Sequence, residues 1–256
     1  MKSLLDLAKA AALAAGRLQR EYYHRQVEVR FKGEIDLVTE VDLMSEKLIV
    51  SLVEASGFPV LGEELAKAEP QGRYWLIDPL DGTTNYAHKF PWFAPSIALM
   101  EDKTPLLGVV YHVMLDELFW AERGQGAYLN GEPIKVSSVS ELGRAVLATG
   151  FPYGVHEQPD KVVGAFRDFL IRAQGVRRPG AAALDLAYVA CGRFDGFWEP
   201  LLKPWDTAAG VLLVEEAGGR VTNYQGEEYD PFQNNILASN GHIHQEMVPI
   251  ASRYVP

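Results

Sequence analysis

The chain opens with the pattern of an amphipathic helix. Its apolar residues recur at three- and four-residue spacing, at Leu4, Leu7, Ala8, Ala11, Ala15 and Leu18. Charged residues interrupt this stretch, so we interpret it as a helix of the mature protein rather than as a secretion signal. A second helical pattern spans residues 43–55 and follows a strand-like segment, residues 36–42, that ends in acids.

Residues 58–129 carry the short apolar runs that are typical of β-strands. Runs at 58–61 and 74–77 predict buried strands, and each run is followed by acids. Four further strands are expected at 94–101, 105–113, 117–122 and 127–129. Short turn signals such as Asp102-Lys103 separate them, and such short connections indicate an antiparallel sheet.

From about residue 145 onward, strands and helices alternate. Strands are expected at 145–149, 175–178, 195–198, 220–222 and 235–239, and helices at 157–172, 181–191, 205–216 and from about 241. A run of strands followed by alternating elements indicates a layered α/β or α+β fold. With 256 residues and no long linker, the chain is expected to form a single domain, 1–256, with a soft internal division near residue 145.

Composition narrows the classes of function. Hydrophobic residues make up 48% of the chain and charged residues 23%, as in ordinary globular proteins. The net charge of −10 argues against a generic nucleic-acid or anionic-membrane surface, and no apolar run is long enough to span a bilayer. The single cysteine, Cys191, excludes an internal disulfide and a multi-cysteine zinc site. A reduced, cytoplasmic location is therefore expected.

Several common catalytic motifs are absent from the sequence. It contains no phosphate-binding P-loop, no dinucleotide-binding glycine motif, no nucleophile elbow and no H-E-x-x-H zinc motif. His242 and His244 are expected to have structural or surface roles, and Cys191 is expected to be a buried, inert thiol. The remaining candidates are acids at the ends of apolar segments, and each alone has a structural explanation such as a turn or a helix-dipole contact.

The segment Asp78–Asn85, with the sequence DPLDGTTN, favours a catalytic role over these structural explanations. Its proline restricts the backbone, so the turn can aim the Asp78 and Asp81 carboxylates and the Leu80 carbonyl toward one point. Residues 82–84 then offer amides and hydroxyls suited to an anion. Acids beside an anion site require cations between them, because two like charges 4 Å apart repel by roughly 4 kcal/mol at an effective dielectric of 20. Oxygen-only ligands indicate Mg²⁺, which suits metal-assisted hydrolysis of a phosphate ester.

Three segments resemble the signatures of the inositol monophosphatase family: Gly62-Glu63-Glu64, Asp78–Asn85 and Trp205-Asp206-x-Ala-Ala-Gly210. Supporting segments occur in the family's order from about residue 5 to 245, and in detail the chain is most similar to the bacterial branch. The resemblance implies a layered αβαβα sandwich and a lithium-sensitive phosphatase with two to three Mg²⁺ ions per site, usually a homodimer. Its expected substrate is a small phosphate monoester, inositol 1-phosphate, hydrolysed by metal-activated water.

The resemblance also implies roles for individual residues. Metal ligands are expected at Glu63, Asp78, the Leu80 carbonyl, Asp81 and Asp206. Thr83, hydrogen-bonded to Asp42, is expected to orient the attacking water and help to deprotonate it, with Glu63 in support. Contacts to the substrate are expected from Asp81, Gly82, Thr83, Gly180, Ala181, Ala182, Glu199 and Asp206.

Two departures from the family's pattern leave the substrate open. Ala181 stands where many relatives carry Ser or Thr, so one hydroxyl contact to a sugar is expected to be missing. The link from Glu63 to Asp78 is shorter than in animal enzymes, which implies a more open mouth of the site. The nearest alternatives are a fructose-1,6-bisphosphatase, a dual sugar phosphatase or a nucleotide phosphatase. The alternative from another class is a regulatory protein that binds RNA polymerase or RNA.

Overall fold

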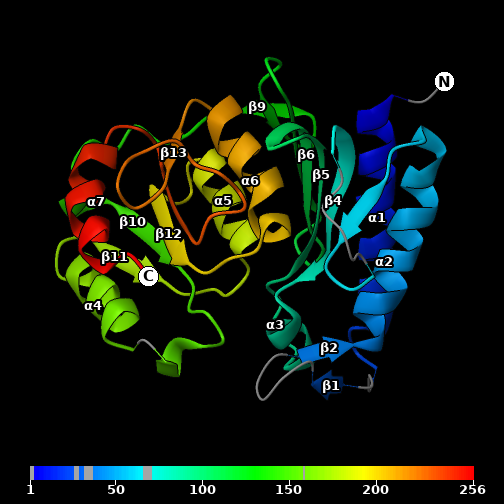
Figure 1. Ribbon diagram of the computed structural model, residues 1–256, viewed down its shortest axis with the longest axis horizontal. Helices are drawn as coiled ribbons and strands as arrows, with labels where there is room; N and C mark the ends of the chain where they lie inside the picture. Colours follow the sequence, from blue (N-terminus) through cyan, green and yellow to red (C-terminus); the bar gives the residue numbers. More distant parts are fainter. Residues whose placement is uncertain (1–2, 26–28, 32–36, 66–70, 158) are drawn as a thin grey trace.

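The computed structural model describes residues 3–25, 29–31, 37–65, 71–157 and 159–256. These residues form five layers, in the order helices, sheet, helices, sheet, helices (Figure 1). The layered αβαβα architecture implied by the resemblance is thereby confirmed. Because both faces of each sheet are covered by helices, strand residues are buried on both sides rather than alternately. In the described part of the chain, no helix combines the length and apolar character that crossing a bilayer requires.

The first helical layer consists of α1 (Leu4–Tyr22) and α2 (Glu40–Val53). Both helices pack on one face of a seven-stranded sheet, and the buried positions of α1 are mostly alanines that allow close approach. Ser3 begins α1 with a capping box, in which its hydroxyl accepts the Asp6 amide at 3.0 Å. The amphipathic pattern at the start of the sequence therefore predicted α1 correctly.

The prediction of a strand-like segment at residues 36–42 is wrong for its second half. The strand β2 (Leu37–Thr39) ends at Thr39, and the next three residues form the first turn of α2. Thr39 is the N-cap of α2, because its hydroxyl accepts the Val41 amide while the Asp42 carboxylate accepts the Thr39 amide at 2.9 Å. This capping box ends the strand earlier than periodicity indicates. Asp36 lies outside the described residues.

The seven-stranded sheet follows the order of the chain. Its strands are β3 (Val60–Gly62), β4 (Arg73–Asp81), β5 (Ala94–Glu101), β6 (Thr104–His112), β7 (Glu117–Glu122), β8 (Ala127–Leu129) and β9 (Glu132–Ile134). Only β3 and β4 are parallel to each other; the later pairs are antiparallel, as the short turns predicted. Asp102, Asp116 and Asn130 adopt the left-handed backbone conformation in these turns. The strand β9 was not predicted.

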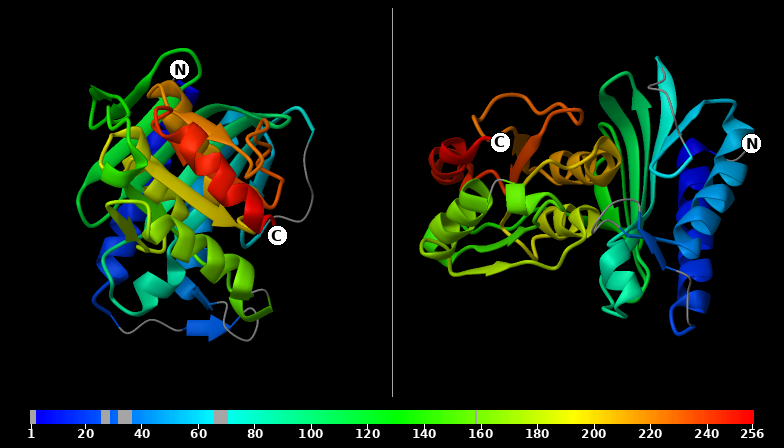
Figure 2. Two further views of the ribbon diagram at one scale, coloured as in Figure 1. Left: turned by 90° about the vertical axis from the view of Figure 1, so that its left-hand side faces the viewer. Right: turned by 60° about the horizontal axis from the view of Figure 1, so that its bottom comes forward.

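A second, five-stranded sheet lies on the other side of a middle helical layer. Its order is β11 (Gly175–Arg177), β10 (Val146–Thr149), β12 (Gly196–Pro200), β14 (Asn235–Ser239) and β13 (Arg220–Thr222). The middle layer consists of α5 (Ala182–Ala190) and α6 (Pro204–Glu216), and the outer layer of α4 (Pro159–Leu170) and α7 (His244–Ala251) (Figure 2). These elements match the predicted ranges to within about three residues.

The short elements are a two-stranded ribbon and several single turns. The ribbon pairs β1 (Val29–Phe31) with β2, and α3 (Thr83–Ala87) follows β4. Turns of 3₁₀ helix occur at Glu54–Ser56, Leu142–Arg144, Val155–Glu157 and Ser252–Tyr254. The chain passes from one sheet to the other between β9 and β10, where the soft division was predicted. Because α5 and α6 pack against both sheets, we propose that the two halves fold as one domain.

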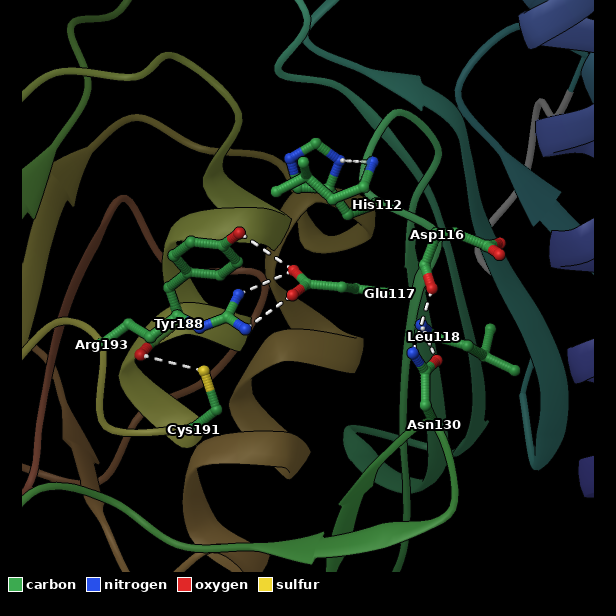
Figure 3. A network of polar contacts seen from close by, with 9 residues as sticks. His112, Asp116, Glu117, Leu118, Asn130, Tyr188, Cys191 and Arg193 are labelled. Atoms are coloured by element: carbon green, nitrogen blue, oxygen red, sulfur yellow. Dashed lines mark hydrogen bonds and ion pairs between the residues drawn. The ribbon is translucent and has the colours of Figure 1, made fainter.

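A polar network ties the end of α5 to the seven-stranded sheet (Figure 3). The Arg193 guanidinium donates two hydrogen bonds, of 2.7 and 2.6 Å, to Glu117 at the start of β7, and the Tyr188 hydroxyl donates a third. Cys191 lies beside this network and is half-buried, whereas the sequence analysis expected a buried thiol. Burial raises the pKa of its thiol, which is consistent with an inert side chain.

The structural role expected for the histidine pair applies to His244. Its side chain is fully buried, and its two ring nitrogens lie 2.9 Å from the Thr222 hydroxyl and 2.8 Å from the Ser239 hydroxyl. Burial lowers the pKa of His244 to about 4, so the ring is neutral at pH 7. His242 is exposed.

Close contact between α6 and β6 generates a first prediction. A Cβ atom added at Gly108 of β6 would lie 2.8 Å from the Ala209 backbone in α6. We expect Gly108→Ala to lower the free energy of unfolding by about 1–3 kcal/mol, because the helix must move away from the sheet. Thermal unfolding should therefore occur at a lower temperature. Gly143→Ala is the control, since the nearest atom there is 3.8 Å away; equal loss in both variants would contradict the packing argument.

Candidate active site

The motif between residues 78 and 85 is built on β4, which is longer than predicted. The strand continues through Pro79 to Asp81, and its pairing with β5 shifts register between Asp78 and Asp81. The proline, which has no amide to donate, lies inside this irregularity. Gly82 then turns the chain into α3 with a positive φ of 91°, and an added Cβ would lie 2.8 Å from the Trp92 carbonyl. Glycine is therefore required at this turn on both grounds.

Backbone amides fix three aspartates beside this turn. One Asp78 carboxylate oxygen accepts the Leu80 amide at 2.9 Å. Asp81 accepts the Ala183 amide at 2.7 Å, which places it at the N-terminus of α5. Asp206, in the first turn of α6, accepts the Lys203 amide at 2.8 Å. Both helix starts favour a negative charge at these positions.

Glu63 reaches the same region from the edge of the sheet. It follows β3 directly, and its amide donates to the Ile77 carbonyl of β4 at 3.1 Å. This bond extends the parallel pairing of β3 with β4 by one residue. The parallel register brings the two acidic strand ends together, because Gly62 pairs with Ile77 immediately before Asp78.

Ten of the twelve residues predicted for the site meet in one cleft of about 530 Å³. Those that line it are Glu63, Asp78, Leu80, Asp81, Gly82, Thr83, Gly180, Ala182, Glu199 and Asp206. Two predicted residues do not belong to this lining. Ala181 is buried in the apolar core between the sheets, behind Gly82, and Asp42 lies beneath Thr83.

The carboxylates of the cleft disfavour one another's charge. Desolvation raises the pKa of Asp78 and of Asp206 well above the usual range, and the neighbouring carboxylates of Glu63 and Asp81 raise both further. Desolvation also raises the pKa of Asp81 to about 7. A positive charge in the cleft would relieve this repulsion, and an oxygen-only set of donors suits Mg²⁺.

The acidic side chains line the cleft but are not arranged as a complete set of ligands around one ion. Among the described residues, no three acidic, histidine or cysteine side chains lie close enough together to hold one ion as they stand. An ion held by three of these side chains at once therefore requires at least one of them to change its rotamer. Three of the four donors have room for such a change, because Glu63, Asp81 and Asp206 are partly exposed, whereas Asp78 is only 2% exposed.

Thr83 and Asp42 form a buried hydrogen-bonded pair. The Thr83 hydroxyl lies 2.9 Å from an Asp42 carboxylate oxygen and 3.1 Å from the Leu80 carbonyl, and it can donate to one of them at a time. Asp42 also accepts the amide and the hydroxyl of Thr39. Burial raises the pKa of Asp42 to about 6, against these hydrogen bonds, so the carboxylate is mostly ionised at pH 7.

Asn85 connects the turn to the residues expected near the substrate. Its side-chain amide donates to the Trp92 carbonyl at 2.8 Å and to the Pro179 carbonyl at 2.9 Å. The second bond fixes the loop that carries Gly180, which has a positive φ of 88°. The two walls of the cleft are thereby joined by one side chain.

Several residues of the cleft were not identified from the sequence. Phe151, Tyr153 and Arg178 also line it, and the Arg178 guanidinium lies 5.4 Å from the centre of the Phe151 ring. Lys203 belongs to the lining as well. The basic pair Arg177-Arg178 at the end of a predicted strand was the available signal for Arg178. No comparable signal marked the two aromatic residues.

Glu199 generates a prediction about pH. It lies on β12 with 6% exposure, and burial, together with the Asp81 charge, raises its pKa to about 8. The folded protein therefore holds this proton over the range in which the unfolded chain has released it. Raising the pH from about 5 to 8 should lower the stability of chelator-treated protein, and the loss should be complete above pH 8.

The Glu199→Gln variant should lose this part of the pH dependence. Comparing thermal unfolding of wild type and variant at pH 5.5 and pH 8.5 isolates the contribution of Glu199 from those of the other acids. An identical pH slope for the two proteins would show that Glu199 does not hold the proton.

Comparisons with known proteins match this chain over nearly its whole length. The model of the inositol monophosphatase family matches residues 1–255. The chain is 41% identical over 252 residues to the inositol-1-monophosphatase of Synechocystis sp., covering 96% of this chain and 88% of that protein. It is 39% identical over 261 residues to the fructose-1,6-bisphosphatase/inositol-1-monophosphatase of Aquifex aeolicus, covering 100% and 97%. It is also 41% identical over 255 residues to the Nus factor SuhB of Escherichia coli K12, covering 97% and 95%.

The fold agrees equally well with a solved structure. The extragenic suppressor protein suhB from Bartonella henselae superimposes with a TM-score of 0.92 at 38% identity, covering 99% of this chain and all of that chain. The layers, the acidic motifs in their order and the extent of these matches lead to one conclusion: the chain belongs to the inositol monophosphatase family.

Proposed function

We propose that this phosphatase is a Mg²⁺-dependent phosphomonoesterase whose principal substrate is inositol 1-phosphate. The observation that carries the proposal is the convergence of four carboxylates, from β3, β4 and α6, in one cleft beside the Gly82 turn. The family is generally metal-dependent, and relatives named inositol-1-monophosphatase support the choice of substrate.

The chain's own residues divide the work of binding. We assign the amides of Gly82 and Thr83 to the phosphate oxygens, because both residues line the cleft beside the acids. We assign Glu199, which lines the cleft, to a hydrogen bond with a polyol hydroxyl. Gly180 and Ala182 line the cleft with little or no side chain, so at these two positions a sugar-sized ring meets no bulky group.

We assign Glu63, Asp78 and the Leu80 carbonyl to one Mg²⁺ and Asp78, Asp81 and Asp206 to a second, with Glu63 supporting a third. Bound Mg²⁺ would supply activation of water and stabilisation of the leaving oxygen.

Thr83 and Asp42 hold and move a proton. The Asp42 carboxylate fixes the Thr83 hydroxyl proton, so the hydroxyl oxygen can accept a hydrogen bond from the attacking water. We also propose lithium sensitivity and a homodimer, which rest on the resemblance, and a cytoplasmic location, which rests on the cysteine content.

One specific observation favours a second substrate class. Arg178 and Lys203 both line the cleft, and together they could hold a second anionic group of the substrate. A sugar bisphosphate such as fructose 1,6-bisphosphate has that group, and the Aquifex aeolicus relative carries both activities in its name. A regulatory role in binding RNA polymerase or RNA is the alternative from another class, to which the SuhB names point.

Phosphate release measured over a panel of inositol, fructose and nucleotide phosphates tests the proposal. Activity should disappear in excess chelator, return with Mg²⁺ and be highest for inositol 1-phosphate. Mg²⁺ should also raise the unfolding temperature, because it binds the folded state. Full activity in excess chelator would exclude the metal mechanism, and a higher kcat/KM for fructose 1,6-bisphosphate would favour the second substrate class.

The Thr83–Asp42 pair generates the mechanistic prediction. Thr83→Ala and Asp42→Asn should each lower kcat by roughly 10²–10⁴, the range of general acid–base assistance, while KM changes little. The double variant should be scarcely worse than the worse single variant, because the two residues act as one unit. Losses that multiply in the double variant would show that the residues act independently.

A further inference from the structure

A second acid of α2 supports the arm of the site that carries Glu63. Glu46 lies one helical turn after Asp42, on the same face of α2. Its side chain is fully buried, and its two carboxylate oxygens accept the amides of Glu64 at 2.9 Å and Leu65 at 3.1 Å. These amides belong to the turn that begins at Glu63. Asp42 thus supports Thr83, and Glu46 supports the Glu63 turn.

The contact between Glu46 and this turn is unusually close. A Cβ atom added at Gly62 would lie 2.0 Å from a Glu46 carboxylate oxygen, so only glycine allows β3 to lie against the carboxylate. The opposite side of β3 pairs with β4, and β3 is at the edge of the sheet. Glu63 is therefore fixed on one side by the ladder to β4 and on the other by Glu46.

We propose that Glu46 is a positioning residue that holds the Glu63 turn ready for cation binding. This inference rests on the proposed Mg²⁺ site. Glu46 lies outside the lining of the cleft but determines the affinity of the site for Mg²⁺. Without Glu46 the turn is anchored on one side only, so cation binding must also order the backbone after Glu63. Residues that hold a metal ligand from behind typically contribute 10- to 100-fold to metal affinity.

Glu46→Gln is the direct test because it keeps the shape of the side chain. A glutamine carbonyl can accept one of the two amides, but its NH₂ group faces the other amide, donor against donor. Gly62→Ala is the second variant and disturbs the same contact from the side of β3, because its methyl group must displace the Glu46 carboxylate. It keeps the proposal testable if Glu46→Gln fails to fold.

Glu216 provides a matched control. It is half-buried at the end of α6, and its carboxylate accepts the amides of Gly124 and Gly126, each at 2.8 Å. It therefore fixes a turn by the same chemistry, but that turn joins β7 to β8 and does not line the cleft. A purely structural effect of losing such a contact should appear equally in Glu216→Gln.

The experiment is calorimetric titration of chelator-stripped protein with Mg²⁺ alone, followed by kcat at saturating Mg²⁺. We expect Glu46→Gln and Gly62→Ala to bind Mg²⁺ about 10- to 100-fold more weakly, with kcat at saturation within roughly threefold of wild type. Glu216→Gln should bind Mg²⁺ like the wild type. Unchanged affinity in both test variants, or an equal loss in Glu216→Gln, would overturn the inference. Failure of the wild type to bind Mg²⁺ would overturn the proposed function itself.

Discussion

Repulsion among carboxylates that share one cleft is the constraint on which the rest of the structure depends. Asp78, Asp81, Asp206 and Glu63 each raise the free energy of ionising another member of the group. The chain keeps them together by giving the three aspartates a backbone amide each and by placing Asp81 and Asp206 at the starts of helices. A positive charge in the cleft lowers this electrostatic repulsion, and a divalent cation supplies that charge.

The layered fold explains how these acids reach one place from distant parts of the chain. The seven-stranded sheet supplies the ends of β3 and β4, the middle layer supplies the N-termini of α5 and α6, and the second sheet supplies Glu199. Behind the cleft, α2 supports two of its parts with acids one turn apart, Asp42 under Thr83 and Glu46 under the Glu63 turn. Gly62 allows β3 to lie against the Glu46 carboxylate, and Gly108 allows β6 to lie against α6.

Much of this arrangement could be predicted from the sequence because its signals are local. Helical periodicity, strand runs and turn residues predicted most elements. The ends of the apolar runs indicated candidate acids, and the family resemblance implied which of them form the site. The second half of the segment 36–42 was predicted wrongly because the Thr39–Asp42 capping box competes with the strand pattern through side-chain hydrogen bonds. Glu46 was not identified because only packing between α2 and the turn after β3 brings it to the site, and Ala181 turns into the core because of packing between the layers.

Anomalous X-ray diffraction from crystals soaked with Mn²⁺, which occupies oxygen-ligand sites that suit Mg²⁺, tests the central claim most directly. The account predicts anomalous peaks inside the cleft, one within ligand distance of Asp78 and Glu63 and another within ligand distance of Asp78, Asp81 and Asp206. Asp206→Asn should remove or weaken the second peak and leave the first. Peaks confined to the protein surface, with the cleft carboxylates unbound at saturating Mn²⁺, would contradict the account.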